Sequence, residues 1–177
     1  MHILLALCLA LFNIKRQNWR YVSRYSRSIW LVILFNLLYY FLCKNYLLWD
    51  FTSKKLGTKT VRFLHIFIIN PLCILLFLSH YPSSWGRQVL YNIKWIIFSL
   101  LVEWVGKRYF KMIYFTHGWN LKWSALVYAK MYTFSLLVLK KPFLTYSLSG
   151  ASAIFYLLLF RVPMNWDIEG FLRRKGS

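Results

Sequence analysis

Two charged residues of this chain lie inside apolar runs, where an unpaired charge is energetically unfavourable. Glu103 falls within the run from Val89 to Val105, and Lys130 lies near the middle of a later run. A charged side chain at the centre of a bilayer costs about 2.5–3.5 kcal/mol on insertion scales unless it is paired, neutralised or facing a cavity. Because the two residues are on successive segments, they can meet as an ion pair that joins two helices. The functional alternative makes Glu103 a proton-accepting or cation-binding carboxylate, with Lys130 snorkelling away from it.

The most specific local pattern follows Glu103 and contains His117, Gly118, Trp119 and Asn120. Glycine permits a tight turn, tryptophan can anchor at a membrane interface, and asparagine can cap the next helix. All three of these roles are structural. The functional alternative is a polar pocket at the membrane surface lined by His117, Asn120 and Glu103.

Two further polar residues occur within apolar segments. We expect Asn36 to make a hydrogen bond between helices, because an amide in a bilayer needs a partner. Asn92 falls broadly on the same helical face as Ser99 and Glu103, at 100° per residue. Aromatic residues at the segment ends predict anchors at the membrane interface: Trp49, Trp104, Trp119 and Trp123.

The sequence lacks the spacing of the common catalytic and metal-binding motifs. His65, His80 and His117 fit no ligand motif such as H-E-x-x-H, so we expect them in turns and at interfaces, and we expect no metal site. No G-x-S-x-G, Walker A or G-x-G-x-x-G pattern is present, and no cofactor is indicated. The three cysteines form no C-x-x-C pair, which favours small buried side chains.

The composition indicates a membrane protein with a strong positive charge. The chain is 59% hydrophobic and 21% aromatic, and 23 Lys and Arg residues against four acids give a net charge of +19. Such a charge suits nucleic acid or anionic lipid. Most of the cations lie between the apolar runs, where juxtamembrane residues belong. We therefore predict contact with anionic lipid headgroups and a possible membrane-protein partner, and no binding of nucleic acid.

Six apolar segments predict an all-α, polytopic transmembrane helical bundle of five or six spans. The first segment is short for a span, which leaves the number open. No repeat or linker divides the chain, so we predict one transmembrane domain over residues 1–163 and a polar tail over residues 164–177. The segments are 2–14, 28–43, 62–79, 88–106, 123–139 and 143–161.

The distribution of cations also bears on orientation. With six spans, the connectors after the second and fourth segments, together with the tail, carry more Lys and Arg than the other connectors. The positive-inside rule then places both termini in the cytoplasm, in a plasma membrane. The strongly basic connector after the first segment, from Lys15 to Arg27, argues for the opposite orientation.

Several short motifs occur in a characteristic order: Leu37-Leu38-Tyr39 with Phe41-Leu42, Leu48-Trp49, His80-Tyr81-Pro82, Glu103-Trp104, Gly118-Trp119-Asn120 and Trp123-Ser124. In this order the chain resembles an uncharacterised family of small multi-pass membrane proteins from spore-forming Gram-positive bacteria. The resemblance covers roughly residues 1–163 and implies location and architecture only, because that family has no assigned activity. Asn36, where the family more often has aspartate, and Leu47, where it often has proline, depart from the pattern.

Three classes of function fit these features. The first is a structural or accessory membrane protein that binds lipid or a partner. The second is a small transporter or substrate-binding membrane subunit with a polar pocket around Glu103. The third is an intramembrane enzyme acting on a lipid headgroup, which the scarcity of acidic residues disfavours. A fold of this kind is compatible with many functions, so the site has to decide among them.

Overall fold

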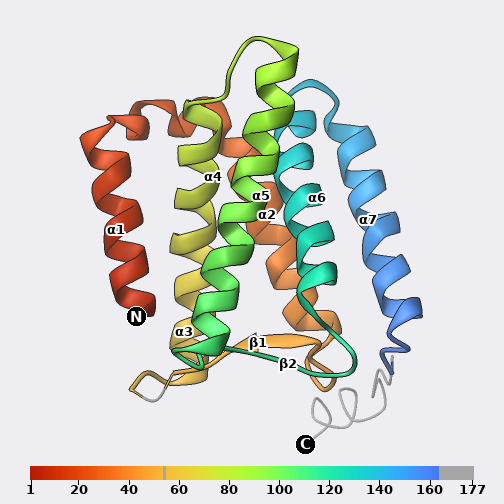
Figure 1. The fold of residues 1–177 in the computed structure, drawn as a ribbon. Helices are drawn as coiled ribbons and strands as arrows, with labels where there is room; N and C mark the ends of the chain where they lie inside the picture. The colour runs from red at the N-terminus through yellow and green to blue at the C-terminus, as the bar shows by residue number, and fades with distance from the viewer. Residues whose placement is uncertain (54, 164–177) are drawn as a thin grey trace, which may run out of the picture.

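The computed structural model describes residues 1–53 and 55–163, and these residues confirm the predicted helical bundle (Figure 1). Each of the six apolar segments forms a helix or a pair of joined helices. The predicted tail, residues 164–177, lies outside the described residues. The helices are α1 His2–Lys15, α2 Val22–Leu42, α3 Thr58–Leu64, α4 Asn70–Ser79, α5 Trp85–Arg108, α6 Leu121–Lys140 and α7 Pro142–Leu159.

Helices α3 and α4 are joined without a break by a π-helical turn, His65–Ile69. Pro71 stands in the first turn of α4 and has no backbone N–H to donate. The wider π-helical turn directly before the proline accommodates the loss of this hydrogen bond. Such turns occur inside longer α-helices. The chain therefore crosses the bundle here as one rod, Thr58–Ser79.

Within the described part of the chain, four helical segments are long and apolar enough to cross a membrane: Asn18–Leu42, Thr58–Ser79, Trp85–Arg108 and Pro142–Leu159. The first of them includes a short 3₁₀ helix, Asn18–Tyr21, before α2. Helix α1 has only 14 residues. Helix α6 contains the polar residues Ser124, Lys130 and Ser135, and it packs against α2, α4, α5 and α7. Protein surrounds α6 on several sides, so its polar side chains can find partners within the bundle.

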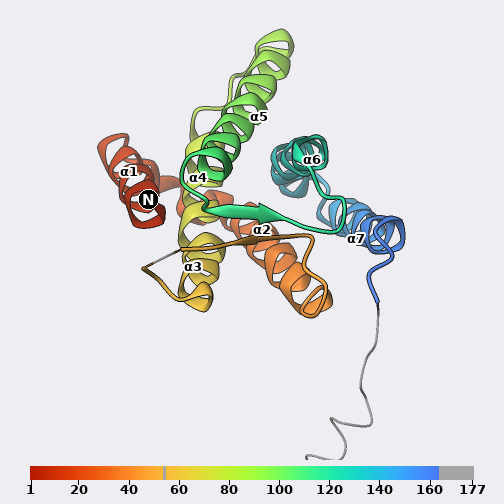
Figure 2. The same cartoon turned by 60° about the horizontal axis from the view of Figure 1, so that its bottom comes forward.

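A two-stranded antiparallel sheet closes one end of the bundle, and the sequence analysis did not anticipate it. Strand β1, Trp49–Phe51, pairs with β2, Ile113–Phe115, so that Asp50 lies opposite Tyr114. Figure 2 shows the ribbon crossing beneath the helices. We call this end of the bundle the sheet end. Helix α2 finishes there and α6 begins there, so the sheet ties together two connectors that are distant in the sequence.

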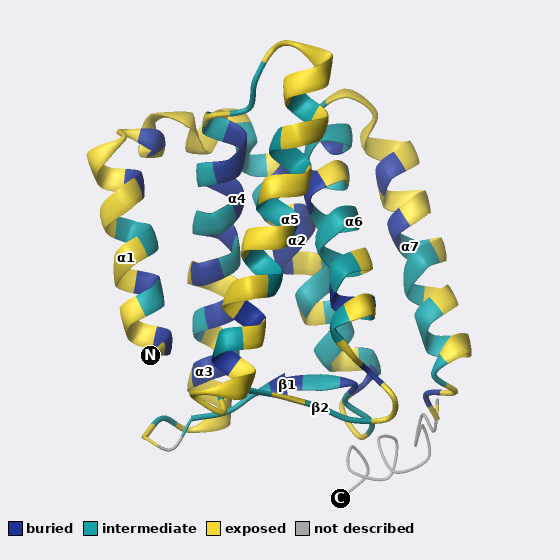
Figure 3. Cartoon of the chain, viewed as in Figure 1, coloured by how far each residue is buried: buried dark blue, intermediate teal, exposed yellow. Residues whose placement is uncertain are grey.

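The core lies between α2, α4 and α6. Val32, Phe77 and Tyr132 are almost fully buried in it, together with Ile74 and Leu78. Figure 3 shows exposed residues along the outward faces of α5 and α7, and many of these residues are large and apolar. Exposed apolar helical faces of this extent are expected where lipid, rather than water, surrounds a protein. On α5 these residues include Ile93, Ile97, Phe98 and Leu101.

Candidate functional site

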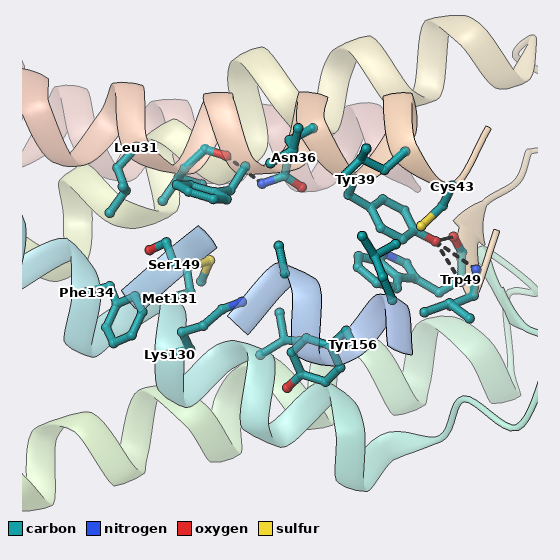
Figure 4. Close-up of a pocket in the computed structure, with 18 of the residues that line it drawn as sticks. Leu31, Asn36, Tyr39, Cys43, Trp49, Lys130, Met131, Phe134, Ser149 and Tyr156 are labelled. Carbon is teal, nitrogen blue, oxygen red and sulfur yellow. Dashed lines mark hydrogen bonds between the residues drawn. The ribbon is translucent and has the colours of Figure 1, made fainter. Parts of the chain in front are cut away.

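A cavity of about 150 Å³ lies between α2, α6 and α7, and it is lined mainly by apolar side chains. It forms an elongated slot, with Leu31 and Phe134 toward one end and Trp49 at the other (Figure 4). The α7 wall includes the small residues Ser149 and Ala153, which lie two turns and one turn before Tyr156 and Leu157. Small residues leave space that larger side chains would fill, so the slot follows directly from the composition of α7.

Lys130 supplies the charge of this cavity, from the α6 wall. Its Nζ donates a hydrogen bond to Ser152 Oγ at 3.0 Å and lies 5.2 Å from the centre of the Tyr156 ring. Within residues 1–53 and 55–163, the ion pair is Arg62 with Asp50, so no described carboxylate neutralises Lys130. An ammonium has three donors, and this one uses a single donor in the hydrogen bonds found. A cation with spare donors therefore lines an apolar slot.

Asn36 lies on the opposite wall of the slot, on α2 (Figure 4). Its Nδ2 donates to the carbonyl of Val32 at 2.8 Å, and its Oδ1 accepts from Asn70 Nδ2 at 3.3 Å. The predicted hydrogen bond between helices is thus present, and it joins α2 to α4. These bonds leave Asn36 as a fixed polar group across the slot from Lys130.

Aromatic rings close the slot at the sheet end. Tyr39 stacks on Trp49 with ring centres 3.7 Å apart, and its hydroxyl donates to the Trp49 carbonyl at 2.6 Å. Trp119 lies beside Trp49, with ring centres 4.8 Å apart. Cys43 follows the end of α2 and lines the same end of the slot, where burial raises the pKa of its thiol to about 11. The thiol therefore stays protonated and unreactive near neutral pH.

Glu103 is buried, with 5% of its surface exposed, but it does not line this cavity. Its Oε1 accepts a hydrogen bond of 2.7 Å from Ser124 Oγ, which in turn accepts from Trp119 Nε1 at 3.1 Å. The expected pairing of Glu103 with Lys130 is therefore wrong. Lys130 lies six positions after Ser124, so their side chains point about 120° apart around α6. A helix that faces one of them therefore does not face the other.

The residues around His117 have structural roles. His117 is exposed and stacks on Tyr46, with ring centres 3.5 Å apart. Asn120 caps α6 as predicted, because its Oδ1 accepts from the Lys122 amide at 2.9 Å. Gly118 has a φ of +83°, which supplies the predicted tight turn. The alternative pocket containing His117, Asn120 and Glu103 is not formed, since each makes different contacts.

The four tryptophans predicted at the interface have different environments. Trp104 is 43% exposed and makes an edge contact with Tyr109. Trp119, in contrast, is only 6% exposed, so the prediction of an anchor facing the membrane interface is wrong for this residue. Its burial follows from the hydrogen bond to Ser124 and from packing against Phe160. Trp49 and Trp123 are half-buried in the same group of rings.

The polar face predicted on α5 is directed at neighbouring parts of the bundle. Ser99 Oγ is 2.6 Å from the Tyr132 hydroxyl on α6. Asn92 Nδ2 donates to the Tyr81 hydroxyl at 3.0 Å. Together with Glu103, these residues fix α5 by side-chain hydrogen bonds, so the common face indicates helix packing.

The most polar cluster of the sheet end, around Asp50, was not predicted from the sequence. Asp50 has no exposed surface, and its carboxylate accepts hydrogen bonds from Arg62 Nε at 2.9 Å and from the Tyr114 hydroxyl at 3.1 Å. Arg62 Nη2 also binds it, which makes the contact two-pronged. Burial and the carboxylate both raise the pKa of Tyr114, so its phenol remains a donor. The sequence signal for this cluster was Asp50 itself, because the chain contains only four acidic residues.

A buried histidine pair was also not anticipated. His2 Nδ1 lies 2.9 Å from His65 Nε2, and His2 Nε2 is 2.8 Å from the Thr52 carbonyl oxygen. His65 is 6% exposed and stacks on Phe51, so its expected place in a turn or at an interface is wrong. The pair attaches the start of α1 to the α3 region. No group of three potential metal ligands occurs in the described part of the chain.

Comparison with protein-family models, curated proteins and solved structures gave no match.

Proposed function

We propose that this protein is an accessory plasma-membrane protein that binds a lipid with a single anionic group in the cavity between α2, α6 and α7. One observation carries the proposal: the Lys130 ammonium lines an apolar slot without a carboxylate partner among the described residues. A cation in such a place is stabilised by an anion that brings its own apolar body.

The dimensions of the slot favour a single acyl chain. Its volume of about 150 Å³ is that of a cavity for a benzene-sized group, so the slot takes up only part of one acyl chain and has no room for a second, and the rest of the chain extends out of the slot. Lys130 lies near the middle of α6, which runs from residue 121 to residue 140. A carboxylate is small enough to enter the slot and reach the Lys130 ammonium there. We therefore propose a ligand of the fatty-acid class, with its carboxylate on Lys130 and its chain directed toward the apolar end of the slot, between Leu31 and Val32 on α2 and Phe134 on α6.

Thermal unfolding of the purified protein tests this assignment. We expect oleate to raise the melting temperature of the wild type, because a ligand that binds only the folded state stabilises it. Oleyl alcohol has the same chain without the charge and is expected to have a much smaller effect. In the variant Lys130→Met, which keeps the length of the side chain, oleate should lose its advantage over the alcohol.

The matched control is Lys122→Met, on the same helix but exposed and outside the cavity lining. This variant should respond to oleate like the wild type. The proposal fails if oleate does not stabilise the wild type, or if Lys130→Met is stabilised to the same degree.

We also propose that both termini face the cytoplasm. The sheet end carries Lys44 in a connector, Lys107 in the last turn of α5 and Lys122 in the first turn of α6, which agrees with the positive-inside rule. The motif order supports a further proposal, that the chain belongs to the family of small multi-pass membrane proteins described above.

A further inference from the structure

A second cavity, of about 660 Å³, lies at the end of the bundle opposite the sheet, where α2 begins and α6 ends. It faces α4, whereas the slot that contains Lys130 faces α7. Its lining contains three cations and no acidic residue. The cations are Arg24, Arg27 and Lys140.

The cations come from two helices that this part of the bundle holds together. Arg24 and Arg27 are three residues apart at the start of α2, so they share a helical face. Lys140 is the last residue of α6. The Ser28 hydroxyl donates to the Ser135 carbonyl at 2.6 Å, and this buried bond fixes the two helices next to the cavity. Three like charges are thus gathered around one space, which attracts an anion.

The side chains in this cavity match the chemistry of a phosphate group. A guanidinium presents paired N–H donors that fit phosphate oxygens, and an ammonium adds a mobile point charge. The Tyr81 hydroxyl accepts from Asn92, which leaves its own proton free for another acceptor. Leu78, Leu136 and Leu139 provide an apolar floor. The cavity is therefore amphiphilic, with its cations at the end of the bundle.

We propose that this second cavity binds the phosphate of an anionic phosphate ester through Arg24, Arg27 and Lys140. An anionic phospholipid headgroup and a soluble phosphate ester share this chemistry. The proposal is independent of the fatty-acid site, because none of the three cations lines that slot.

Thermal unfolding with three probes distinguishes the two sources. The probes are dioctanoyl phosphatidylglycerol, the zwitterionic dioctanoyl phosphatidylcholine and glycerol 1-phosphate. Stabilisation by phosphatidylglycerol alone identifies a lipid headgroup, and stabilisation by glycerol 1-phosphate identifies a soluble ester. Either result supports the proposal if it is lost in the cavity variants. It is overturned if neither anionic probe stabilises the protein, or if phosphatidylcholine is as effective as phosphatidylglycerol.

The double variant Arg24→Gln/Arg27→Gln should bind the active probe at least tenfold more weakly. The matched control, Arg16→Gln/Arg20→Gln, removes the same charge from the preceding segment, outside the cavity lining, and should stay within twofold of the wild type. Lys140→Gln should weaken binding if the double variant fails to fold. Lys130→Met should bind the probe like the wild type. Unchanged binding in the cavity variants, or equal losses in the control, would refute the site.

Discussion

Asp50 links strand β1 to three other elements of the sheet end. Its buried carboxylate joins β1 to α3 through Arg62, to β2 through Tyr114 and to α2 through the Tyr40 hydroxyl at 3.3 Å. Removing one partner from a buried ion pair leaves the other without compensation, which is usually costly. Arg62 is 31% exposed and can partly recover its hydration, so the loss of folding stability should be smaller than for a fully buried ion pair.

We therefore expect Asp50→Asn to lower the free energy of unfolding by about 2–3 kcal/mol. Unfolding in detergent with increasing denaturant measures this change. The double variant Asp50→Asn/Arg62→Met should lose less stability than the sum of the two single variants, because Arg62→Met removes the cation that Asp50→Asn leaves without a partner. Lys59→Met, at an exposed position of α3, serves as the control. An additive double variant would contradict the assigned pairing.

The Cys43 thiol gives a test of burial at the aromatic end of the slot. Its pKa is raised by burial from 9.0 to about 11, so the reactive thiolate is about a hundred times scarcer at neutral pH than in an ordinary cysteine. In a protein with Cys8→Ala and Cys73→Ala, alkylation by iodoacetamide should rise about tenfold per pH unit up to roughly pH 10. Denaturation should accelerate the reaction at pH 7.4 by about a hundredfold. A rate that levels off near pH 9 would contradict the burial of this group.

At the scale of elements, the helices could be predicted but the sheet could not. Apolar runs bounded by cations and aromatic rings indicate helices, and the structure has helices over all six. Strands of three residues leave almost no periodic signal, and three α-helices separate β1 from β2 in the sequence. Glu103 was recognised as buried, but its partner was misassigned because helical phase, which favours Ser124 over Lys130, outweighs charge complementarity.

The contact between α2 and α6 separates the two cavities, so its packing can be tested directly. Ser28 is fully buried and bonds to the Ser135 carbonyl. Ser28→Ala should cost about 1 kcal/mol, the usual contribution of one hydrogen bond. Ser28→Leu should cost about 1–3 kcal/mol more, because a larger side chain forces the helices apart. Melting temperatures measure both effects, with Ser83→Leu as the exposed control. Equal stability of the two Ser28 variants would contradict this close contact.

At the scale of the whole molecule, both ends of the described chain lie at the sheet end. His2 contacts the Thr52 carbonyl, and Val162 is buried with Cys43 and Leu48. An even number of helical rods produces this arrangement, and a membrane protein built this way exposes both ends on one side. The two cavities therefore lie at different levels along the bundle. The slot that contains Lys130 runs beside the helices, and the basic cavity lies at the end of the bundle opposite the sheet.

Cysteine labelling in intact cells tests the orientation. In a background with Ala at positions 8, 43 and 73, Lys44→Cys and Lys122→Cys place thiols at the sheet end, and Arg16→Cys and Arg87→Cys place them at the opposite end. We expect an impermeant maleimide to label the second pair in intact cells and the first pair only after permeabilisation, because positive connectors are retained in the cytoplasm. The reverse pattern would show that the basic connector before α2 sets the orientation, and mixed labelling within a pair would contradict the six-rod topology.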